Sequence, residues 1–386
     1  MTRQSHTTRI VDSDSHLYEM ADTWLDHIDP NQRHLGLTIE RDPNGWDWVC
    51  FQGQPILECW ISTAGDLQTL GPSLEACRQG LPCPFDYAND VPQHYWEPGA
   101  RAASLADMGV DESILFPHWG LNWNLALRDH PEARLVNETA WNRWAVEVRA
   151  DSGGRLHPVG HLELFDLDWL EQQLRNLAAG GIKLGWIPAG LVDGVAPSHP
   201  DLDRAWSLFE HYGINPVFHV GASPVRPFQD GWYAGHHSAY VPLLSFPLLG
   251  MDVFVTLCDL VLNGVMERHP TLRFGVMEVM TDWFPMLLRR LDTTPFSELL
   301  MTGRSSLQLS MKPSDYVRRS VRISSFASER PGKTIDQVGP LLMWSADFPH
   351  AEGEPTVEIY RNKAGPIPTD AADAFWGANA EFLLGR

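Results

Sequence analysis

Three short apolar segments, far apart in the chain, each carry side chains of the kinds that bind metal ions. Residues 9–19 read RIVDSDSHLYE, residues 215–221 read NPVFHVG, and residues 341–350 read LLMWSADFPH. Their polar members are Asp12, Asp14, His16 and Glu19, then His219, then Asp347 and His350. Polar groups at the C-terminal ends of separate strands are where a (β/α)8 barrel keeps its active site. Carboxylates and imidazoles that converge there indicate a metal, so the pattern predicts a metalloenzyme.

The length of the chain fits a single α/β domain, a (β/α)8 TIM barrel that spans residues 1–386. Such barrels take about 250 residues and reach beyond 400 through insertions. Residues 20–98 are rich in Trp, Pro and Gly and too long for a simple loop, so we expect a capping insertion after strand 1, over the barrel mouth. A second long excursion, residues 221–270, is expected after strand 5.

Strand and helix patterns alternate along the rest of the chain. We expect strands at 10–14, 112–117, 156–163, 181–186, 216–219, 272–278, 321–326 and 341–346. We expect helices near 98–108, 131–151, 167–179, 201–212 and 283–293, and two more at the C-terminus. Residues 295–320 are expected to be irregular. Eight strands with helices between them complete the predicted barrel.

Charge and composition argue against two classes of partner. The formal net charge of −20 disfavours nucleic acid, because a nucleic-acid binder needs a clustered basic face. The chain has no run of about 18 apolar residues and no apolar stretch of a signal peptide, so we expect a cytoplasmic protein without a membrane partner. The five cysteines form no C-x-x-C pair and are expected to be reduced thiols. Whether the chain forms a homo-oligomer stays open.

The spacing within the first segment places two donors on one face of a strand. Asp14 and His16 are two residues apart, so both side chains point to the same side, which in a barrel can be the lumen. His219 and Asp347 would approach from the opposite wall. The simpler alternatives are a surface turn for Asp14 and a hydrogen-bonded core histidine for His219. The joint arrangement favours the metal site over both.

The same segments resemble the amidohydrolase superfamily, specifically the amidohydrolase-2 branch related to aminocarboxymuconate semialdehyde decarboxylase. The resemblance covers roughly residues 9–385 and includes the RHPTLRFGVME run at 268–278. In that family a D-x-H-type motif ends strand 1, a histidine ends strand 5 and an aspartate ends strand 8. The resemblance therefore implies metal ligands at Asp14, His16, His219 and Asp347.

One position departs from the family and changes the expected charge of the site. Many amidohydrolases end strand 6 in a histidine, whereas this chain has Glu278, and Glu19 follows the strand-1 ligands by one turn. Four carboxylates around one divalent ion leave a formal charge of −2, and two carboxylates about 4 Å apart repel by roughly 4 kcal/mol at an effective dielectric of 20. A second divalent ion would offset this charge. The ligand inventory matches that of carboxylate-bridged di-iron proteins.

We therefore predict a dinuclear iron site with ligands Asp14, His16, Glu19, His219, Glu278 and Asp347. Of these, Glu19, Glu278 and Asp347 are expected to be catalytic. The predicted reaction is hydroxylation of a bulky hydrophobic, terpenoid-type small molecule with O2, and the resemblance supplies a precedent in the non-haem di-iron monooxygenase of platensimycin and platencin diterpenoid biosynthesis. The alternative is a mononuclear Zn- or Mn-dependent hydrolase or non-oxidative decarboxylase. A barrel that only binds is the third reading.

Other residues near the expected mouth are assigned to substrate contact or to support of the ligands. They are His161, Lys183, His237 and His350. The resemblance also raises a carboxylated Lys183 as a bridge between metals, which the sequence neither supports nor excludes. Many of the 16 tryptophans fall in the expected mouth segments, which suits an apolar substrate.

Overall fold

Eight parallel strand positions form the centre of the molecule in the computed structural model, which describes residues 9–221 and 247–386. They are β1 (Val11–Leu17), β5 (Glu112–Pro117), β6 (Leu156–Pro158) continued by β7 (Gly160–His161), β8 (Leu184–Trp186), β9 (Asn215–His219), β10 (Phe274–Met277), β11 (Val321–Ser325) and β12 (Leu342–Trp344). Every ladder between neighbours in this series is parallel. This order is that of a (β/α)8 barrel.

The two sheets that contain these strands close into one ring. One sheet has the order β1-β5-β6 and the other has the order β12-β11-β10-β9-β8-β7, with Val159 alone between β6 and β7. At the other seam the amide of His16 donates to the carbonyl of Phe348 at 2.7 Å. The amide of Asp347 donates to the carbonyl of Asp14 at 2.8 Å. The predicted TIM barrel is confirmed.

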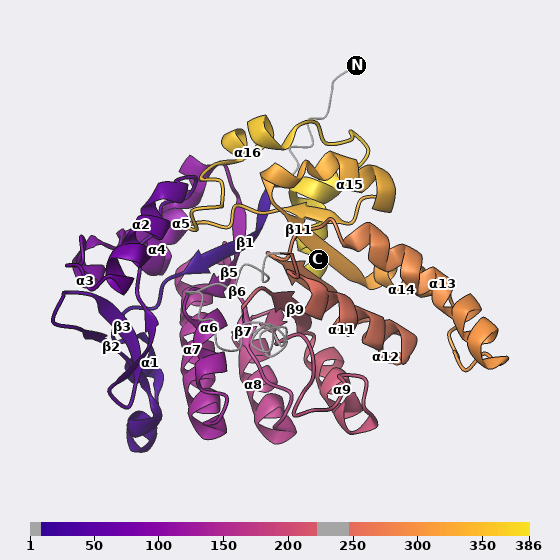
Figure 1. The fold of residues 1–386 in the computed structure, drawn as a ribbon, viewed down its shortest axis with the longest axis horizontal. Helices are drawn as coiled ribbons and strands as arrows, with labels where there is room; N and C mark the ends of the chain where they lie inside the picture. The colour runs from indigo at the N-terminus through magenta and orange to yellow at the C-terminus, as the bar shows by residue number, and fades with distance from the viewer. Residues whose placement is uncertain (1–8, 222–246) are drawn as a thin grey trace.

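Helices surround the barrel on its outer side (Figure 1). In chain order they are α5 (Pro98–Met108), α7 (Pro131–Asp151), α8 (Leu167–Ala179), α9 (Asp203–Tyr212), α11 (Met251–Leu262), α12 (Val265–Arg268), α13 (Phe284–Thr302), α14 (Pro313–Ser320), α15 (Pro331–Val338) and α16 (Val357–Ala364). Local sequence sets their ends: in α5 the Glu97 carboxylate caps two amides, Pro98 occupies the first turn, and Gly109 ends the helix at φ 77°.

Apolar side chains fill the interior of the barrel up to the polar groups at its C-terminal end. Val11, Ile114, Leu184, Val217 and Met343 belong to one buried cluster, which also contains Leu383 and Leu384. The helix α17 (Asn379–Leu383) thus closes the end at which the strands begin. His16, His219 and Asp347 lie toward the opposite end, where the strands finish.

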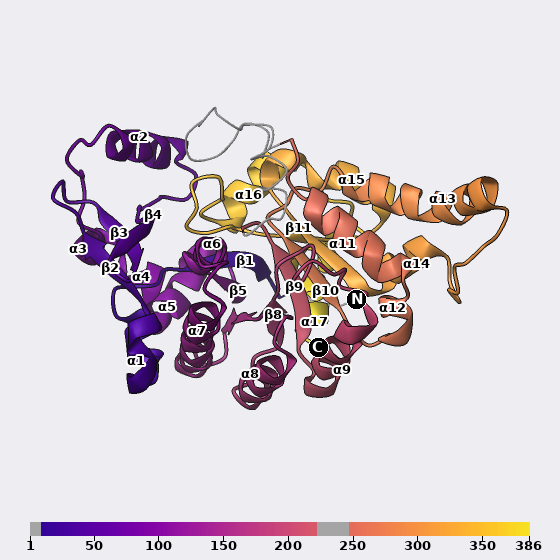
Figure 2. The same ribbon diagram turned by 60° about the horizontal axis from the view of Figure 1, so that its bottom comes forward.

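The insertion after β1 forms a lobe on one side of the barrel (Figure 2). It contains α1 (Thr23–His27), η1 (Pro30–Leu35), the antiparallel sheet of β2 (Leu37–Arg41), β3 (Asp47–Phe51) and β4 (Gln54–Glu58), then α2 (Leu67–Arg78), α3 (Tyr87–Asp90) and α4 (Gln93–Trp96). Lobe residues Trp24 and Val49 share a buried cluster with barrel residues. The stretch after β4 reaches the barrel mouth, where Ser62 Oγ donates to the carbonyl of Pro349 at 2.7 Å.

Three local predictions differ from the structure. Strand β1 runs on to Leu17, so His16 lies within the strand instead of after its predicted end at Asp14. The expected irregular stretch at 295–320 is wrong in part, because α13 continues through Pro295 to Thr302 and α14 follows. A proline removes one helical hydrogen bond, yet the helix continues past Pro295 although the side chains of Phe296, Leu299 and Leu300 are exposed. The short helix α6 (Gly120–Ala126) was not expected.

Within the described ranges no helix has the length and apolarity needed to span a membrane.

Candidate metal site

Donor side chains from four strand ends meet at the C-terminal face of the barrel. Asp14 and His16 come from β1, His219 ends β9, Glu278 follows β10, and Asp347 lies three residues after β12. One ligand atom from each of Asp14, His16 and His219 lies within 4.8 Å of the other two. The same holds for the group His16, Glu278, Asp347 and His350. The two groups overlap at His16.

The distances between the donor atoms suit shared coordination. His219 Nε2 lies 3.2 Å from Asp14 Oδ1 and 3.2 Å from Glu278 Oε2. His16 Nε2 lies 3.2 Å from Asp347 Oδ1 and 3.5 Å from Glu278 Oε2. Ligand atoms that bind one ion at about 2.0–2.2 Å are separated by roughly 3–3.5 Å. The cluster therefore has the spacing of a coordination shell.

Several buried atoms of this cluster have no hydrogen-bond partner among the described residues: Asp14 Oδ2, His16 Nε2, Glu278 Oε2 and both carboxylate oxygens of Asp347. Buried polar groups in native proteins are almost always paired, so such a concentration needs an explanation. The other ring nitrogens of the histidines face backbone carbonyls, with His16 Nδ1 3.3 Å from Pro117 O and His219 Nδ1 2.7 Å from Val220 O. This arrangement turns both Nε2 atoms toward the centre, as in metal-ligating histidines. The donor set fits a divalent cation.

The charges of the cluster also favour a cation. Burial, followed by the charges of Asp347 and Asp14, raises the pKa of Glu278 well above its usual range. Burial, followed by the charge of His350, lowers the pKa of His16 well below its usual range. Within the described part of the chain, neither Lys nor Arg forms an ion pair with Asp14, Glu278 or Asp347. A bound divalent ion would supply the missing positive charge.

Two of the carboxylate residues have strained backbones. Glu278 has φ 53° and Asp347 has φ 49°, both in the left-handed region that non-glycine residues rarely occupy. Each is held by a hydrogen bond: Ser324 Oγ accepts from the amide of Glu278, and the carbonyl of Asp14 accepts from the amide of Asp347. Such conformations cost about 1–3 kcal/mol and concentrate at functional sites.

Glu19, predicted as a ligand, has a different role in the structure. Its carboxylate accepts backbone hydrogen bonds from His118 at 3.0 Å, Trp119 at 2.9 Å and Gly120 at 2.9 Å, at the start of α6. It belongs to neither group of converging ligand atoms. Burial raises the pKa of Glu19 to about 7, although the three amides act in the other direction. Its oxygens are occupied, so we reassign Glu19 to anchoring this loop.

His350 lies inside the cluster and is supported by His118. Its Nδ1 is 3.0 Å from Asp347 Oδ1, and its Nε2 is 3.0 Å from His118 Nδ1. The ring of His118 stacks on Tyr18 at 3.7 Å and meets the edge of Trp60 at 4.4 Å. Burial has the largest single effect and lowers the pKa of His350, but the contact with Asp347 and the charges of Asp347, Glu352 and Asp14 together raise the pKa to about 8.

Of the remaining sequence candidates, Lys183 and His161 do not join the cluster. Lys183 precedes β8 and is exposed to solvent, so it is not placed to bridge metals from within the barrel. His237 lies outside the described residues. His161 ends β7, is fully buried between Trp123 and Trp186, and lies 3.5 Å from Glu138. Glu138 comes from the middle of α7, and no sequence motif distinguished it.

The Glu138–His161 pair gives a test by pH. Burial raises the pKa of Glu138 to about 8 and lowers that of His161 well below its usual range, so the pair is neutral near pH 7. Because the folded-state pKa exceeds the unfolded value of about 4.5, the stability contributed by this group falls as pH rises from about 4.5 to about 8. In Glu138→Gln we expect this loss, on the order of 4 kcal/mol, to disappear. Urea unfolding of both proteins at pH 5 and pH 9 measures it, and parallel pH profiles would contradict the assignment.

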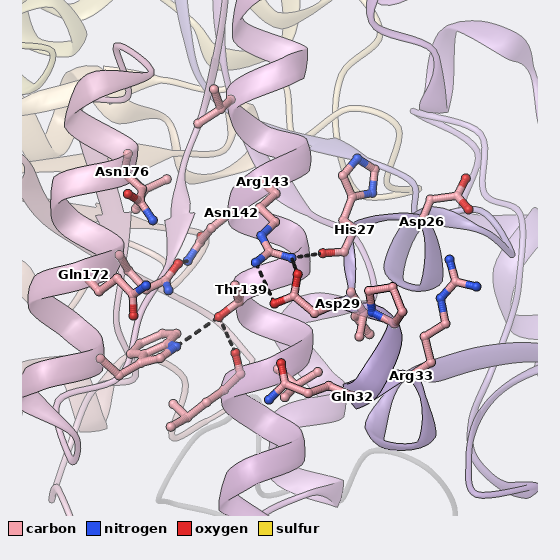
Figure 3. Close-up of a pocket in the computed structure, with 18 of the residues that line it drawn as sticks. Asp26, His27, Asp29, Gln32, Arg33, Thr139, Asn142, Arg143, Gln172 and Asn176 are labelled. Carbon is pink, nitrogen blue, oxygen red and sulfur yellow. Dashed lines mark hydrogen bonds and ion pairs between the residues drawn. The ribbon is translucent and has the colours of Figure 1, made fainter.

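A cleft of about 870 Å³ lies elsewhere, between the lobe and the outer face of α7 and α8 (Figure 3). Arg143 bridges it by an ion pair to Asp29 at 3.0 Å and a hydrogen bond to the carbonyl of His27 at 2.6 Å. Trp169 Nε1 donates to Thr139 Oγ1 at 3.0 Å in its wall. None of the donor residues lines this cleft, so the cleft is separate from the candidate metal site.

The chain matches no family model, and no curated protein matches it. It is similar to the crystal structure of an amidohydrolase from Mycobacterium avium subsp. paratuberculosis, with a TM-score of 0.79 at 20% identity over 98% of this chain and 100% of that one. A 5-carboxyvanillate decarboxylase from Sphingomonas paucimobilis gives a TM-score of 0.59 at 18% identity over 98% and 99%. One from Novosphingobium aromaticivorans, complexed with manganese and a nitrobenzoic acid, gives 0.65 at 16% identity over 99% and 97%. These likenesses show the fold that the chain shares with amidohydrolases and decarboxylases.

Proposed function

We propose that the chain is a divalent-metal-dependent enzyme that acts on a small organic molecule at the C-terminal face of the barrel. One observation carries this proposal: buried donor atoms of two histidines and three carboxylates converge from four strand ends, and those of His16 and the three carboxylates include atoms without a hydrogen-bond partner among the described residues. A purely structural cluster would instead pair these atoms with one another or with the backbone. The likeness to a manganese-bound decarboxylase of the same fold supports the metal.

The residues that would hold the ion are Asp14, His16, His219 and Asp347. A metal bound there supplies Lewis acidity to a substrate oxygen or lowers the pKa of a bound water. Glu278 Oε2, within 3.5 Å of both imidazoles, is placed to hold or move a proton at the reacting group. Tyr18 and Trp60 form an aromatic wall next to the cluster, with their ring centres 6.4 Å apart. This wall suits a flat or apolar substrate.

Non-oxidative decarboxylation or hydrolysis on a single zinc or manganese is the reaction class that the comparisons support. The similar structures include 5-carboxyvanillate and 2,6-dihydroxybenzoate decarboxylases and an amidohydrolase. Both reactions need one ion that orients the substrate, and the four ligands named above are enough for it.

Oxygenation by iron is the second candidate, and Glu278 is the observation that favours it. A carboxylate at this position makes the site more negative, and no arginine or lysine in the described part of the chain pairs with the cluster to receive a substrate carboxylate. A neutral, bulky apolar substrate and iron ions that activate O2 are compatible with that charge. Terpenoid-type molecules belong to this class.

Metal content and isotope labelling distinguish the two reaction classes. Protein purified without added metal is expected to retain at least one divalent ion per chain, measured by plasma mass spectrometry. Decarboxylation or hydrolysis predicts turnover under anaerobic conditions with zinc or manganese. Oxygenation predicts that the iron-loaded, reduced protein transfers one oxygen atom from ¹⁸O₂ to an apolar substrate. Absence of any bound divalent ion at neutral pH would contradict the proposal itself.

A further inference from the structure

We propose that Arg101 is a positioning residue for the metal ligands on both sides of the seam between β1 and the segment after β12. This inference rests on the proposed metal-dependent function and deepens it, because it names a residue that sets the geometry of the ligands without binding the ion. Arg101 lies on α5, and its side chain is fully buried. No sequence motif distinguished it.

The guanidinium of Arg101 contacts both of the segments that meet at this seam. Its Nη2 donates to Ser15 Oγ at 2.5 Å and lies 3.5 Å from the carbonyl oxygen of Phe348. Ser15 Oγ itself donates to that carbonyl at 3.2 Å. Ser15 lies between the two proposed ligands of β1, and Phe348 directly follows the ligand Asp347. One side chain of α5 therefore joins the two segments that carry three of the four proposed ligands.

The ring of Phe348 is held by side chains of α4 and α5. The guanidinium carbon of Arg101 lies 4.3 Å from the centre of the ring, and a cation over an aromatic face is attracted to it. Tyr95 and His94 meet the same ring at 5.3 Å and 5.8 Å between ring centres. Phe348 is thus fixed both by its ring and by its carbonyl group.

This anchoring matters because Asp347 has a strained backbone. Its φ of 49° lies in the left-handed region, and such conformations persist only where surrounding contacts fix them. The amide of Asp347 donates to the carbonyl of Asp14. The carbonyl of Phe348, which Arg101 contacts, accepts from the amide of His16. These contacts keep Asp347 Oδ1 3.2 Å from His16 Nε2, the separation that one shared ion requires.

The buried charge of Arg101 also indicates more than packing. A guanidinium is always protonated in proteins, and Nε and Nη1 of Arg101 have no hydrogen-bond partner among the described residues. Its charge interacts with that of the Asp12 carboxylate, which accepts from the amides of Asp14 at 3.2 Å and Ala346 at 2.9 Å. An apolar side chain would fill this space without the cost of burying unpaired donors. The charge is therefore best explained by the orientation of the seam.

Replacement of Arg101 by methionine tests this inference on the full chain. Methionine keeps a flexible apolar stem but removes the charge and every donor. The Kd for Mn²⁺ alone is expected to rise about 10- to 100-fold, as is usual when a residue that orients metal ligands is lost. The electron paramagnetic resonance spectrum of bound Mn²⁺ is expected to change, because the ligands no longer keep one arrangement. Arg101→Lys retains the charge and a donor for Ser15 and is expected to recover part of the affinity.

Two further variants separate positioning from a general loss of stability. Ser15→Ala removes the hydroxyl that accepts from Arg101 and is expected to weaken Mn²⁺ binding in the same direction. Combined with Arg101→Met it is expected to add little, because the two residues act through one contact. Leu260→Ala opens a cavity beside the buried face of α11 and is expected to lower Tm while Mn²⁺ affinity and spectrum stay unchanged.

The outcomes distinguish this inference from the proposed function. Unchanged Mn²⁺ affinity and spectrum in both Arg101→Met and Ser15→Ala would overturn the positioning role and leave the metal-dependent function intact. An equal loss of affinity in Leu260→Ala would also overturn it, because lowered stability would then explain every variant. If Arg101→Met does not fold, Ser15→Ala decides alone. Absence of Mn²⁺ binding by the unaltered chain would overturn both the inference and the function.

Discussion

Replacement of His219 by alanine is expected to abolish metal binding by the set Asp14, His16, His219 and Asp347, and to abolish turnover with it. His219 Nε2 lies 3.2 Å from both Asp14 Oδ1 and Glu278 Oε2, so its loss leaves these two carboxylates facing each other without the imidazole between them. Loss of an outer partner of a ligand already costs about 10- to 100-fold in metal affinity, and loss of the ligand itself is expected to cost more. Equilibrium dialysis against the divalent ion, followed by plasma mass spectrometry, measures the change.

A nearby histidine supplies the matched control. His211 lies on α9, shortly before β9, and is exposed to solvent. His211→Ala is expected to bind metal as the unaltered chain does and to keep its activity. Circular dichroism measures the secondary structure of each variant and so separates loss of metal from loss of fold. Both variants are expected to keep the spectrum of the unaltered chain, because β9 is mostly buried and should persist. Full metal occupancy in a folded His219→Ala protein would contradict the assignment of His219 as a metal ligand.

The barrel could be predicted from sequence because its signals are local. Strand β5 and helices α5, α7 and α8 begin and end where the apolar pattern and the capping residues placed them. Pro295 indicated the end of a helix, but α13 continues through it to Thr302. Helix α6 lacked an apolar pattern long enough to be recognised.

From the sequence, only the site residues at the ends of strands could be predicted. Asp14, His16, His219, Glu278 and Asp347 converge because they lie at or near the carboxyl ends of neighbouring parallel strands, which chain order and barrel topology already imply. Whether each binds metal stays a prediction. Residues on loops and helices were beyond such reasoning. The direction of the Glu19 side chain depends on α6, and the position of Glu138 depends on how α7 packs against β7.

The charges of the site link the proposed metal binding to the stability of the fold. Asp14 and Asp347 are buried and the side chain of Glu278 is 11% exposed, two of the three residues have left-handed backbone conformations, and none has a lysine or arginine partner in the described chain. Without cations, these groups oppose folding, because burial and mutual repulsion disfavour their charged forms. Metal binding to the folded state is therefore expected to stabilise the protein as well as activate it, in proportion to RT ln(1 + [L]/Kd).

Glu19→Ala is expected to destabilise the fold without removing a metal ion. The carboxylate of Glu19 accepts hydrogen bonds from three buried amides, those of His118, Trp119 and Gly120. Each unsatisfied buried donor costs about 1–3 kcal/mol, so for three donors we expect a loss of about 3–9 kcal/mol in the free energy of unfolding. At about 2.1 cal/mol/K of unfolding entropy per residue, such a loss lowers the Tm of this chain by roughly 4–11 °C. Glu19→Gln keeps an acceptor oxygen of the same reach and is expected to lose less.

The same two variants separate an anchoring role for Glu19 from a ligand role. If Glu19 only holds the start of α6, Glu19→Ala should keep its metal stoichiometry below its lowered Tm, and Glu19→Gln should restore most of the stability. If Glu19 were a ligand, both variants would lose one ion, because the amide of glutamine is a far weaker ligand than a carboxylate. Differential scanning calorimetry and metal analysis on the same samples give both readouts. An unchanged Tm together with loss of one ion would reverse the reassignment of Glu19.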